Sequence, residues 1–239
     1  MESESARTLA GINILQGLDE AVLHRLESRC RWRRVTPGQR LIDFGAESRE
    51  VFFIIDGAVS VVNFSANGRE IAFATVEAGD LFGEISAIDG RPRSASVVAV
   101  APSLIATLPA GTFVELLKTE AEVSFRLVER MTKLVRAGDI RIMELSTLAA
   151  AQRVYAELLR MAQPDAAVPG LWVVRPLPPL REIASRVSTT RETAARALSQ
   201  VYSTGLMRRK GRNLYLMDKA KLEEFVSALQ FAETGRAGG

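Results

Sequence analysis

The sequence predicts an α+β chain in which an N-terminal β-barrel is followed by a long helix and a C-terminal winged helix-turn-helix. Three observations support this fold class. Short β-rich runs separated by turn residues fill most of the first half. A continuous helical pattern with an apolar repeat follows. The last third holds two short helical patterns and then two short strands around a basic turn.

These patterns divide the 239 residues into four segments. We expect a barrel domain over 1–120 and a dimerisation helix with its hinge over 121–148. A winged helix-turn-helix domain is expected over 149–231, and a disordered tail over 232–239. Two domains of this size are each long enough to enclose a hydrophobic core.

The barrel segment opens with an amphipathic pattern at 13–28, where Leu15, Leu18, Val22 and Leu26 predict a short helix. Strands are then expected at 41–42, 51–55, 59–64, 71–76, 96–100 and 104–108. Turn residues separate these runs, and the Asn67-Gly68 pair is a strong signal for a two-residue hairpin. Many short strands with regular turns are typical of a sandwich or barrel.

The long helix carries apolar or small residues at alternating spacings of three and four. They are Val128, Met131, Val135, Gly138, Ile142, Leu145 and Ala149. Such a seam predicts a parallel two-helix dimer. An ordinary core-facing stripe stays open as the alternative, because three heptads are near the minimum for a coiled coil. A second apolar line, Leu127 and Leu134, is expected to pack back onto the barrel.

The composition argues against several classes of protein. Cys30 is the single cysteine and His24 the single histidine, so a disulfide within the chain, an iron–sulfur centre and a histidine-based zinc site or triad are not expected. We find no Walker-type loop and predict neither a catalytic nor a metal site. Cys30 is interpreted as a packing residue. No apolar run approaches 18 residues and no signal core is seen, so we expect a cytoplasmic protein without a membrane partner.

Positive charge is concentrated near the end of the chain. The formal net charge is +3, but residues 181–212 hold eight basic residues against two acidic ones. A basic module on a mildly acidic body indicates a polyanionic partner at that end. A solvated basic surface is the other interpretation of such a run.

The segment 181–200 has the pattern of a helix-turn-helix. Ile183, Ala184 and Val187 form the inner face of a first helix, and Thr190 is a good N-cap for a second. The buried stripe of the second helix is expected to consist of Ala195, Leu198 and Val201. Two short helices joined by a tight turn leave the second helix exposed on the surface.

Two sets of side chains are therefore candidates for DNA contact. Arg191, Glu192 and Arg196 lie on the outer face of the second helix, where arginine can bind guanine and glutamate can accept from cytosine. Thr190, at the start of this helix, is a further candidate for DNA contact. Arg208, Arg209 and Lys210 lie on a basic strand and turn that predict a wing. Cations in a wing contact phosphates and add affinity without specifying sequence.

Two motifs resemble those of the CRP/FNR family of bacterial transcription regulators. FGEISAIDGRPRSA at 82–95 is similar to the phosphate-binding cassette of cyclic-nucleotide domains, and TRETAAR at 190–196 is similar to the family's recognition helix. The resemblance covers about 15–216. It implies a jelly-roll barrel that binds cAMP or cGMP as an allosteric ligand, a homodimer, and binding to double-stranded DNA at TGTGA-like palindromic half-sites. It also makes loop 163–170 a candidate contact for RNA polymerase, which its composition alone does not establish.

The resemblance assigns a set of ligand-binding positions. Arg93 neutralises the cyclic phosphate, Ser94 adds a hydroxyl, and Glu84 accepts the ribose 2′-hydroxyl. The whole set is Gly83, Glu84, Ile85, Ser86, Arg93, Ser94, Gly138 and Asp139. The alternative is an Arg93–Glu84 ion pair in an empty site, in a family member that binds DNA without a nucleotide.

Two departures from the family pattern affect these expectations. Gly138 and Asp139 stand where cAMP-dependent members have adjacent Thr and Ser. The Asp139 carboxylate accepts hydrogen bonds and matches the two donors of guanine, so we hypothesise that cGMP binds at least as well as cAMP. Pairing of Asp139 with Arg136 or Arg141 across the dimer is the competing interpretation. Ser188 replaces the usual turn glycine, which predicts a positive φ at a non-glycine residue.

Overall fold

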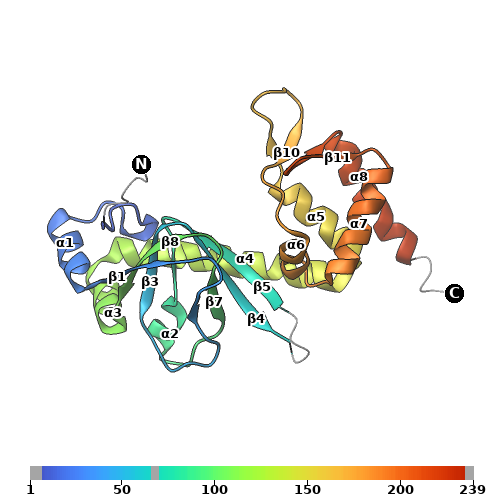
Figure 1. Cartoon of the computed structure of the whole chain (residues 1–239). Helices are drawn as coiled ribbons and strands as arrows, with labels where there is room; N and C mark the ends of the chain where they lie inside the picture. Colours follow the sequence, from blue (N-terminus) through green and yellow to red (C-terminus); the bar gives the residue numbers. More distant parts are fainter. Residues whose placement is uncertain (1–6, 66–69, 235–239) are drawn as a thin grey trace. The chain divides into compact units, whose positions relative to one another are not determined.

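The computed structural model describes residues 7–65 and 70–234. The chain forms two compact units, Met1–Val135 and Arg136–Gly239, and the division falls inside the longest helix, α4 (Ala121–Thr147) (Figure 1). The segment predicted as the dimerisation helix, 121–148, forms one continuous helix up to Thr147. The domain boundaries stay a prediction.

The first unit begins with two short helices instead of the single predicted one. A 3-10 turn, η1 (Asn13–Leu15), is separated from α1 (Glu20–Arg29). The expectation of one helix over 13–28 is wrong because Gly17 adopts a φ of +79°, which interrupts the helical backbone. Leu15 and Leu26 are nevertheless buried in one cluster, as their spacing predicts.

Eight strands form two antiparallel four-stranded sheets. One sheet has the order β1-β8-β3-β6 and the other β2-β7-β4-β5. The strands are β1 (Arg31–Val35), β2 (Arg40–Ile42), β3 (Val51–Asp56), β4 (Ala58–Phe64), β5 (Glu70–Glu77), β6 (Leu81–Phe82), β7 (Ser96–Ala99) and β8 (Ser103–Leu108). Sequence patterns missed β1, which is largely basic, and β6, which has two residues. The predicted Asn67-Gly68 hairpin lies outside the described residues.

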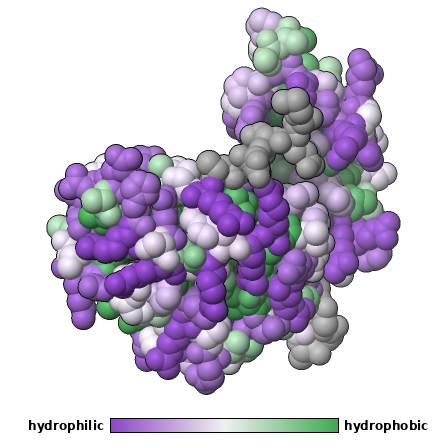
Figure 2. Space-filling model, turned by 60° about the vertical axis from the view of Figure 1, so that its left-hand side comes forward, coloured by the Kyte–Doolittle hydropathy of each residue, from purple (hydrophilic) through white to green (hydrophobic). Residues whose placement is uncertain are grey.

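Apolar side chains fill both sides of the first sheet. Phe52 and Ile54 face a cluster shared with β4 and β7, whereas Val51 and Phe53 face α3 (Ala110–Thr119) and the start of α4. Burial on both faces explains why β3 is almost continuously apolar. Polar side chains cover most of the face seen in Figure 2.

Of the two residues in the second apolar line of α4, only one packs as predicted. Leu127 is buried against the first unit, but Leu134 is 40% exposed. The apolar cluster extends along α4 to Met131 and stops there. The expectation that Leu134 packs onto the barrel is therefore wrong.

The second unit contains α5 (Ala150–Met161), a helix-turn-helix and a small sheet. The helices of the motif are α6 (Leu180–Arg186) and α7 (Arg191–Ser203), followed by α8 (Lys219–Thr234). The sheet order is β11-β12-β10-β9, with β9 (Gln163–Pro164), β10 (Trp172–Val174), β11 (Met207–Lys210) and β12 (Asn213–Leu216). The predicted wing is thus the β11–β12 hairpin.

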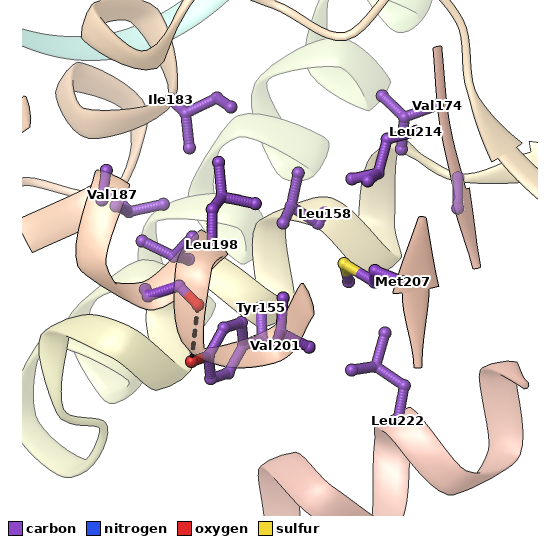
Figure 3. Packing of buried hydrophobic residues seen from close by; sticks show 14 of the residues in the cluster. Tyr155, Leu158, Val174, Ile183, Val187, Leu198, Val201, Met207, Leu214 and Leu222 are labelled. Atoms are coloured by element: carbon purple, nitrogen blue, oxygen red, sulfur yellow. Dashed lines mark hydrogen bonds between the residues drawn. The ribbon is translucent and has the colours of Figure 1, made fainter. Parts of the chain in front are cut away.

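Figure 3 shows how the core of this unit forms. Leu158, Ile183, Leu198 and Leu214 converge from α5, α6, α7 and β12. The hydroxyl of Tyr155 donates to the carbonyl of Ala197 at 3.0 Å, which satisfies the one polar atom of this buried ring.

The buried face of α7 differs by one position from the prediction. Ala194, Ala197, Leu198 and Val201 are buried, whereas Ala195 is only half-buried. The expectation for Ala195 is wrong because positions i, i+3, i+4 and i+7 share one helical face, and Ala194 begins that series.

Candidate anion site and nucleic-acid interface

The predicted phosphate cassette folds into a sharp turn before a short helix. Gly83 has a φ of +85° and precedes α2 (Glu84–Asp89). A Cβ atom at this position would lie 2.8 Å from Arg93 Nη1 and 2.9 Å from the carbonyl oxygen of Glu50. Only glycine therefore allows this backbone to approach the arginine so closely.

Arg93 is a buried cation whose hydrogen bonds go to neutral acceptors and whose nearest carboxylate lies beyond hydrogen-bond distance. Its side chain donates to Ser48 Oγ at 3.0 Å, to the Gly83 carbonyl at 2.9 Å and to the Glu50 carbonyl at 2.8 Å. Glu50 Oε2 lies 3.7 Å from Nη2. The residue is 3% exposed, and burial lowers the pKa of its guanidinium. Because this charge is incompletely balanced, the site favours an anion.

Glu84 is paired with a residue that the sequence did not point to. Arg130 on α4 donates to Glu84 Oε1 at 2.9 Å and to Asp80 Oδ1 at 2.6 Å. Burial alone lowers the pKa of Arg130, but the two carboxylates outweigh it and raise the pKa. The alternative expectation of an Arg93–Glu84 ion pair is wrong, because the Glu84 carboxylate pairs with Arg130 instead. No local pattern identifies Arg130, since it lies 46 residues from Glu84.

The remaining cassette residues differ in exposure. Ser86 is buried, whereas Ile85 and Ser94 are exposed. Six of the eight predicted ligand-binding residues thus belong to the first unit, and of these Arg93 bonds directly to the Gly83 carbonyl. Gly138 and Asp139 lie on an exposed stretch of α4 that belongs to the second unit.

The cap and the turn of the helix-turn-helix form as the sequence predicts. Thr190 caps α7, with Oγ1 accepting from the Thr193 backbone at 3.2 Å. Ser188 has a φ of +54°, which confirms the expectation for this turn. Hydrogen bonds to its own backbone N–H and to Thr190 lower the pKa of Glu192, so its carboxylate is ionised at neutral pH.

The candidate DNA-contacting side chains are all exposed. Arg191, Glu192 and Arg196 project from the first two turns of α7. Arg208, Arg209 and Lys210 lie on β11 beside the turn at Gly211, where the Arg209 guanidinium donates to the Gly211 carbonyl at 3.0 Å. A cationic helix and a cationic hairpin on one unit suit the phosphates and base edges of a duplex.

Other kinds of site receive no support from the described residues. They contain no group of three or more His, Cys, Asp or Glu side chains placed to hold a metal ion. None of the helices within the described ranges has the length and apolar content needed to span a membrane. Cys30 is half-buried, and burial raises the pKa of its thiol to about 12, which agrees with a packing role.

A barrel with a buried cation, followed by a winged helix-turn-helix, defines a class of DNA-binding regulators that carry a ligand-sensing domain. Residues 32–120 match the cyclic nucleotide-binding domain, and residues 152–225 match the Crp-like helix-turn-helix domain. The chain belongs to the CRP/FNR family of transcription regulators.

Proteins from three bacteria are similar to this chain in sequence or in fold. The cAMP-activated global transcriptional regulator Vfr of Pseudomonas aeruginosa is 29% identical over 199 residues, which are 80% of this chain and 92% of Vfr. The cyclic AMP receptor protein of Thermus thermophilus is 28% identical over 200 residues, which are 82% of this chain and 89% of that protein. A CooA mutant from Carboxydothermus hydrogenoformans has the same fold, with a TM-score of 0.74 and 21% identity, covering 95% of this chain and 97% of CooA.

Proposed function

We propose that this protein is a homodimeric transcription regulator in which a cyclic nucleotide bound at Arg93 controls DNA binding by α7 and the wing. The buried Arg93 guanidinium carries this proposal. Its hydrogen-bond acceptors are a hydroxyl and two carbonyl oxygens, and the Glu50 carboxylate, 3.7 Å away, balances its charge only in part, so a phosphate can still pair with it.

The number of donors on Arg93 fits a cyclic phosphate. A guanidinium has five N–H groups, and three of them are used within the protein. Two N–H groups therefore remain for the phosphate oxygens. Backbone N–H groups at the start of α2 and the exposed Ser94 hydroxyl add further donors.

Glu84 supports recognition of the ribose. Arg130 bonds to Oε1 of Glu84 and thereby orients the carboxylate. The second oxygen, Oε2, then accepts the 2′-hydroxyl, a group that deoxyribonucleotides lack. Removal of this hydroxyl from the ligand should weaken binding, because a buried acceptor would lose its donor.

Base recognition is assigned to Gly138 and Asp139 on α4. Asp139 is exposed, so its carboxylate is free to accept from guanine, and we propose that cGMP binds at least as well as cAMP. Arg141 donates within its own chain to Ser188, which makes it a weaker competitor for Asp139 than Arg136. Calorimetric titration with both nucleotides decides: tight cAMP binding without measurable cGMP binding would refute the preference.

Dimerisation is assigned to the seam on α4. Val128, Val135, Ile142 and Leu145 stay more than 40% exposed in the single chain, although their spacing is that of a coiled-coil contact. A second α4 helix would cover them. Sedimentation of the full chain should give the mass of a dimer, and a monomer at micromolar concentration would contradict the proposal.

DNA recognition follows from the residues on α7. Arg191 reads a guanine, Glu192 accepts from a cytosine, and Arg196 reads a further base, which corresponds to a TGTGA-like half-site. In a dimer the two recognition helices would enter successive major grooves, about 34 Å apart. Occupancy of the Arg93 site would favour the dimer arrangement with this spacing.

A mobility shift on a TGTGA-type palindrome tests the whole proposal. It is run with no nucleotide, with cAMP and with cGMP. Tighter binding with either nucleotide supports a sensor. Equal binding in all three lanes supports the second candidate, a regulator that binds DNA without an effector, which the engagement of Arg93 with Glu50 and Gly83 also allows.

The loop between β9 and β10 is proposed as a polymerase contact. Asp165 accepts from the backbone of Ala167 and Val168 and from the Arg175 side chain at 3.0 Å, so the loop has a defined conformation. Val168 is exposed in this loop. Transcription in vitro with an altered Val168 would show whether activation, rather than DNA binding, depends on it.

A further inference from the structure

The turn between α6 and α7 contains a strained residue. Ser188 has a φ of +54° and is the one non-glycine residue with a positive φ in the part of the chain that the structure describes. A glycine would adopt this conformation without strain. Strained residues persist where neighbouring contacts hold them, and they cluster at functional sites. The hydroxyl is the group that Ser188 supplies and a glycine would lack.

The Ser188 hydroxyl is bonded to the end of the long helix. Arg141 on α4 donates from Nη2 to Ser188 Oγ at 3.0 Å. Both residues belong to the second unit. Burial lowers the pKa of the Arg141 guanidinium, two carboxylates oppose this effect, and two cations reinforce it. These four groups are Glu144, Arg153, Glu157 and Arg160.

A second contact joins the same turn to the α4–α5 connection. Arg153 on α5 donates from Nε to the Val187 carbonyl at 2.9 Å and from Nη1 to the Leu148 carbonyl at 2.7 Å. Val187 and Ser188 are adjacent in the turn. The backbone just before α7 is therefore attached both to α4 and to the segment that follows α4.

Ion pairs extend this connection to α6. Arg160 on α5 pairs with Glu144 on α4 and with Glu157 on α5. Glu157 lies 3.5 Å from Arg186 on α6. The last turns of α4 thus contact α5 directly through charged side chains, and α5 in turn contacts α6 through Glu157.

We propose that Arg141 is a positioning residue that acts through Ser188 to couple the orientation of α7 to that of α4. Arg141 touches neither DNA nor ligand in this role. A reorientation of α4 is passed to the recognition helix because the guanidinium holds the turn from which α7 begins. The inference rests on the proposed response to a cyclic nucleotide, since α4 carries both the dimer seam and the predicted base contacts.

The test measures how strongly a nucleotide changes DNA affinity. Full-length protein is titrated onto a fluorescent TGTGA-type palindrome without nucleotide, with cAMP and with cGMP, and the ratio of Kd values gives the coupling factor. Arg141→Met, Ser188→Gly and the double variant are compared with the wild type. We expect each single variant to reduce the coupling factor at least fivefold and the double variant to reduce it no further, because both remove one interaction.

Ser188→Gly separates positioning from stability. It relieves the strained φ, so thermal unfolding should be unchanged or shifted to higher temperature. A coupling factor that stays at the wild-type value in Ser188→Gly overturns the proposal. Arg141→Lys keeps a cationic donor, so it should retain part of the coupling factor that Arg141→Met loses. Lys133→Met, which removes an exposed charge elsewhere on α4, is the control and should match the wild type.

If neither nucleotide changes the DNA affinity of the wild type, the proposed effector is refuted. Hydrogen exchange then tests the Arg141–Ser188 interaction independently of any nucleotide. Arg141→Met should accelerate exchange in the peptide 185–192 at least fivefold. The same substitution made in the Ser188→Gly background should add no acceleration. Equal acceleration in both backgrounds, or none in either, would overturn the positioning role.

Discussion

The two units use arginine in opposite ways. Arg93 in the barrel is buried and bonded to three residues, Ser48, Glu50 and Gly83. Arg191 and Arg196 on α7 are exposed, and Arg196 reaches Thr193 Oγ1 at 3.4 Å, one turn away. One cation is fixed before its partner arrives, whereas the others keep conformational freedom.

The difference between a fixed and a mobile arginine matches the difference in size between a small anion and a DNA duplex. A small monoanion offers few contacts, so a pre-oriented guanidinium avoids the entropy cost of ordering on binding. DNA offers many phosphates, and exposed cations gain from counterion release and from long-range attraction. A single substitution at Arg93 should therefore cause a large loss of nucleotide affinity. A single substitution of an exposed cation should cause a smaller loss of DNA affinity, because the remaining cations still contact the DNA.

The largest effect is expected at Arg93. Arg93→Met keeps most of the volume but removes the cation, and loss of one partner of a buried charged pair costs about 2–5 kcal/mol. Nucleotide affinity measured by calorimetry should fall by roughly 30-fold to a few thousandfold. Arg91→Met, at an exposed arginine of the same turn, is the control. Comparable affinities for the two variants would refute the assigned role of Arg93.

The next effect is expected at Gly83. Gly83→Ala forces a side chain into a left-handed conformation and toward the Glu50 carbonyl, so the free energy of unfolding should fall by roughly 1–3 kcal/mol. Thermal unfolding measures it. Gly111→Ala is the matched control, because a Cβ there meets nothing within 4 Å and Ala favours the helix α3. Equal changes in the two variants would show that the turn is not tightly constrained.

DNA titrations of two variants should distinguish a residue that contacts a base from a residue that contacts a phosphate. Arg191→Ala should cost about 1–3 kcal/mol on the TGTGA-type site and relax specificity at one position. Arg209→Ala should weaken specific and random DNA alike and reduce the salt slope by about one. Anisotropy titrations at several salt concentrations measure both. Equal losses on specific and random DNA for Arg191→Ala would contradict its role in base reading.

The smallest effect is expected at the helix cap. Thr190→Ala removes the acceptor for the Thr193 backbone N–H, so the free energy of unfolding of the second unit should fall by about 0.5–2 kcal/mol. Thr190→Ser keeps the hydroxyl and should behave as the wild type in chemical denaturation. A Ser variant as unstable as the Ala variant would assign the effect to the lost methyl group instead.

Several features of the molecule could be predicted because they depend on residues close in sequence. The cap at Thr190 and the wing hairpin each involve neighbours within a few positions, whereas the positive φ at Ser188 was expected from the resemblance, because the family usually has a glycine in this turn. The helix at 13–28 was mispredicted because a glycine within an amphipathic pattern can either continue or interrupt the helix.

By itself, the sequence determined the order of the elements and the recognition helix, because periodicity and capping are local properties, and it identified the cassette through the resemblance of a continuous motif to those of the family. Only the tertiary structure decided that Arg130 bonds to Glu84, that Leu134 is left exposed, and that Arg141 holds Ser188. Such contacts join residues more than 40 positions apart, and their geometry depends on how whole elements pack, which no local pattern encodes.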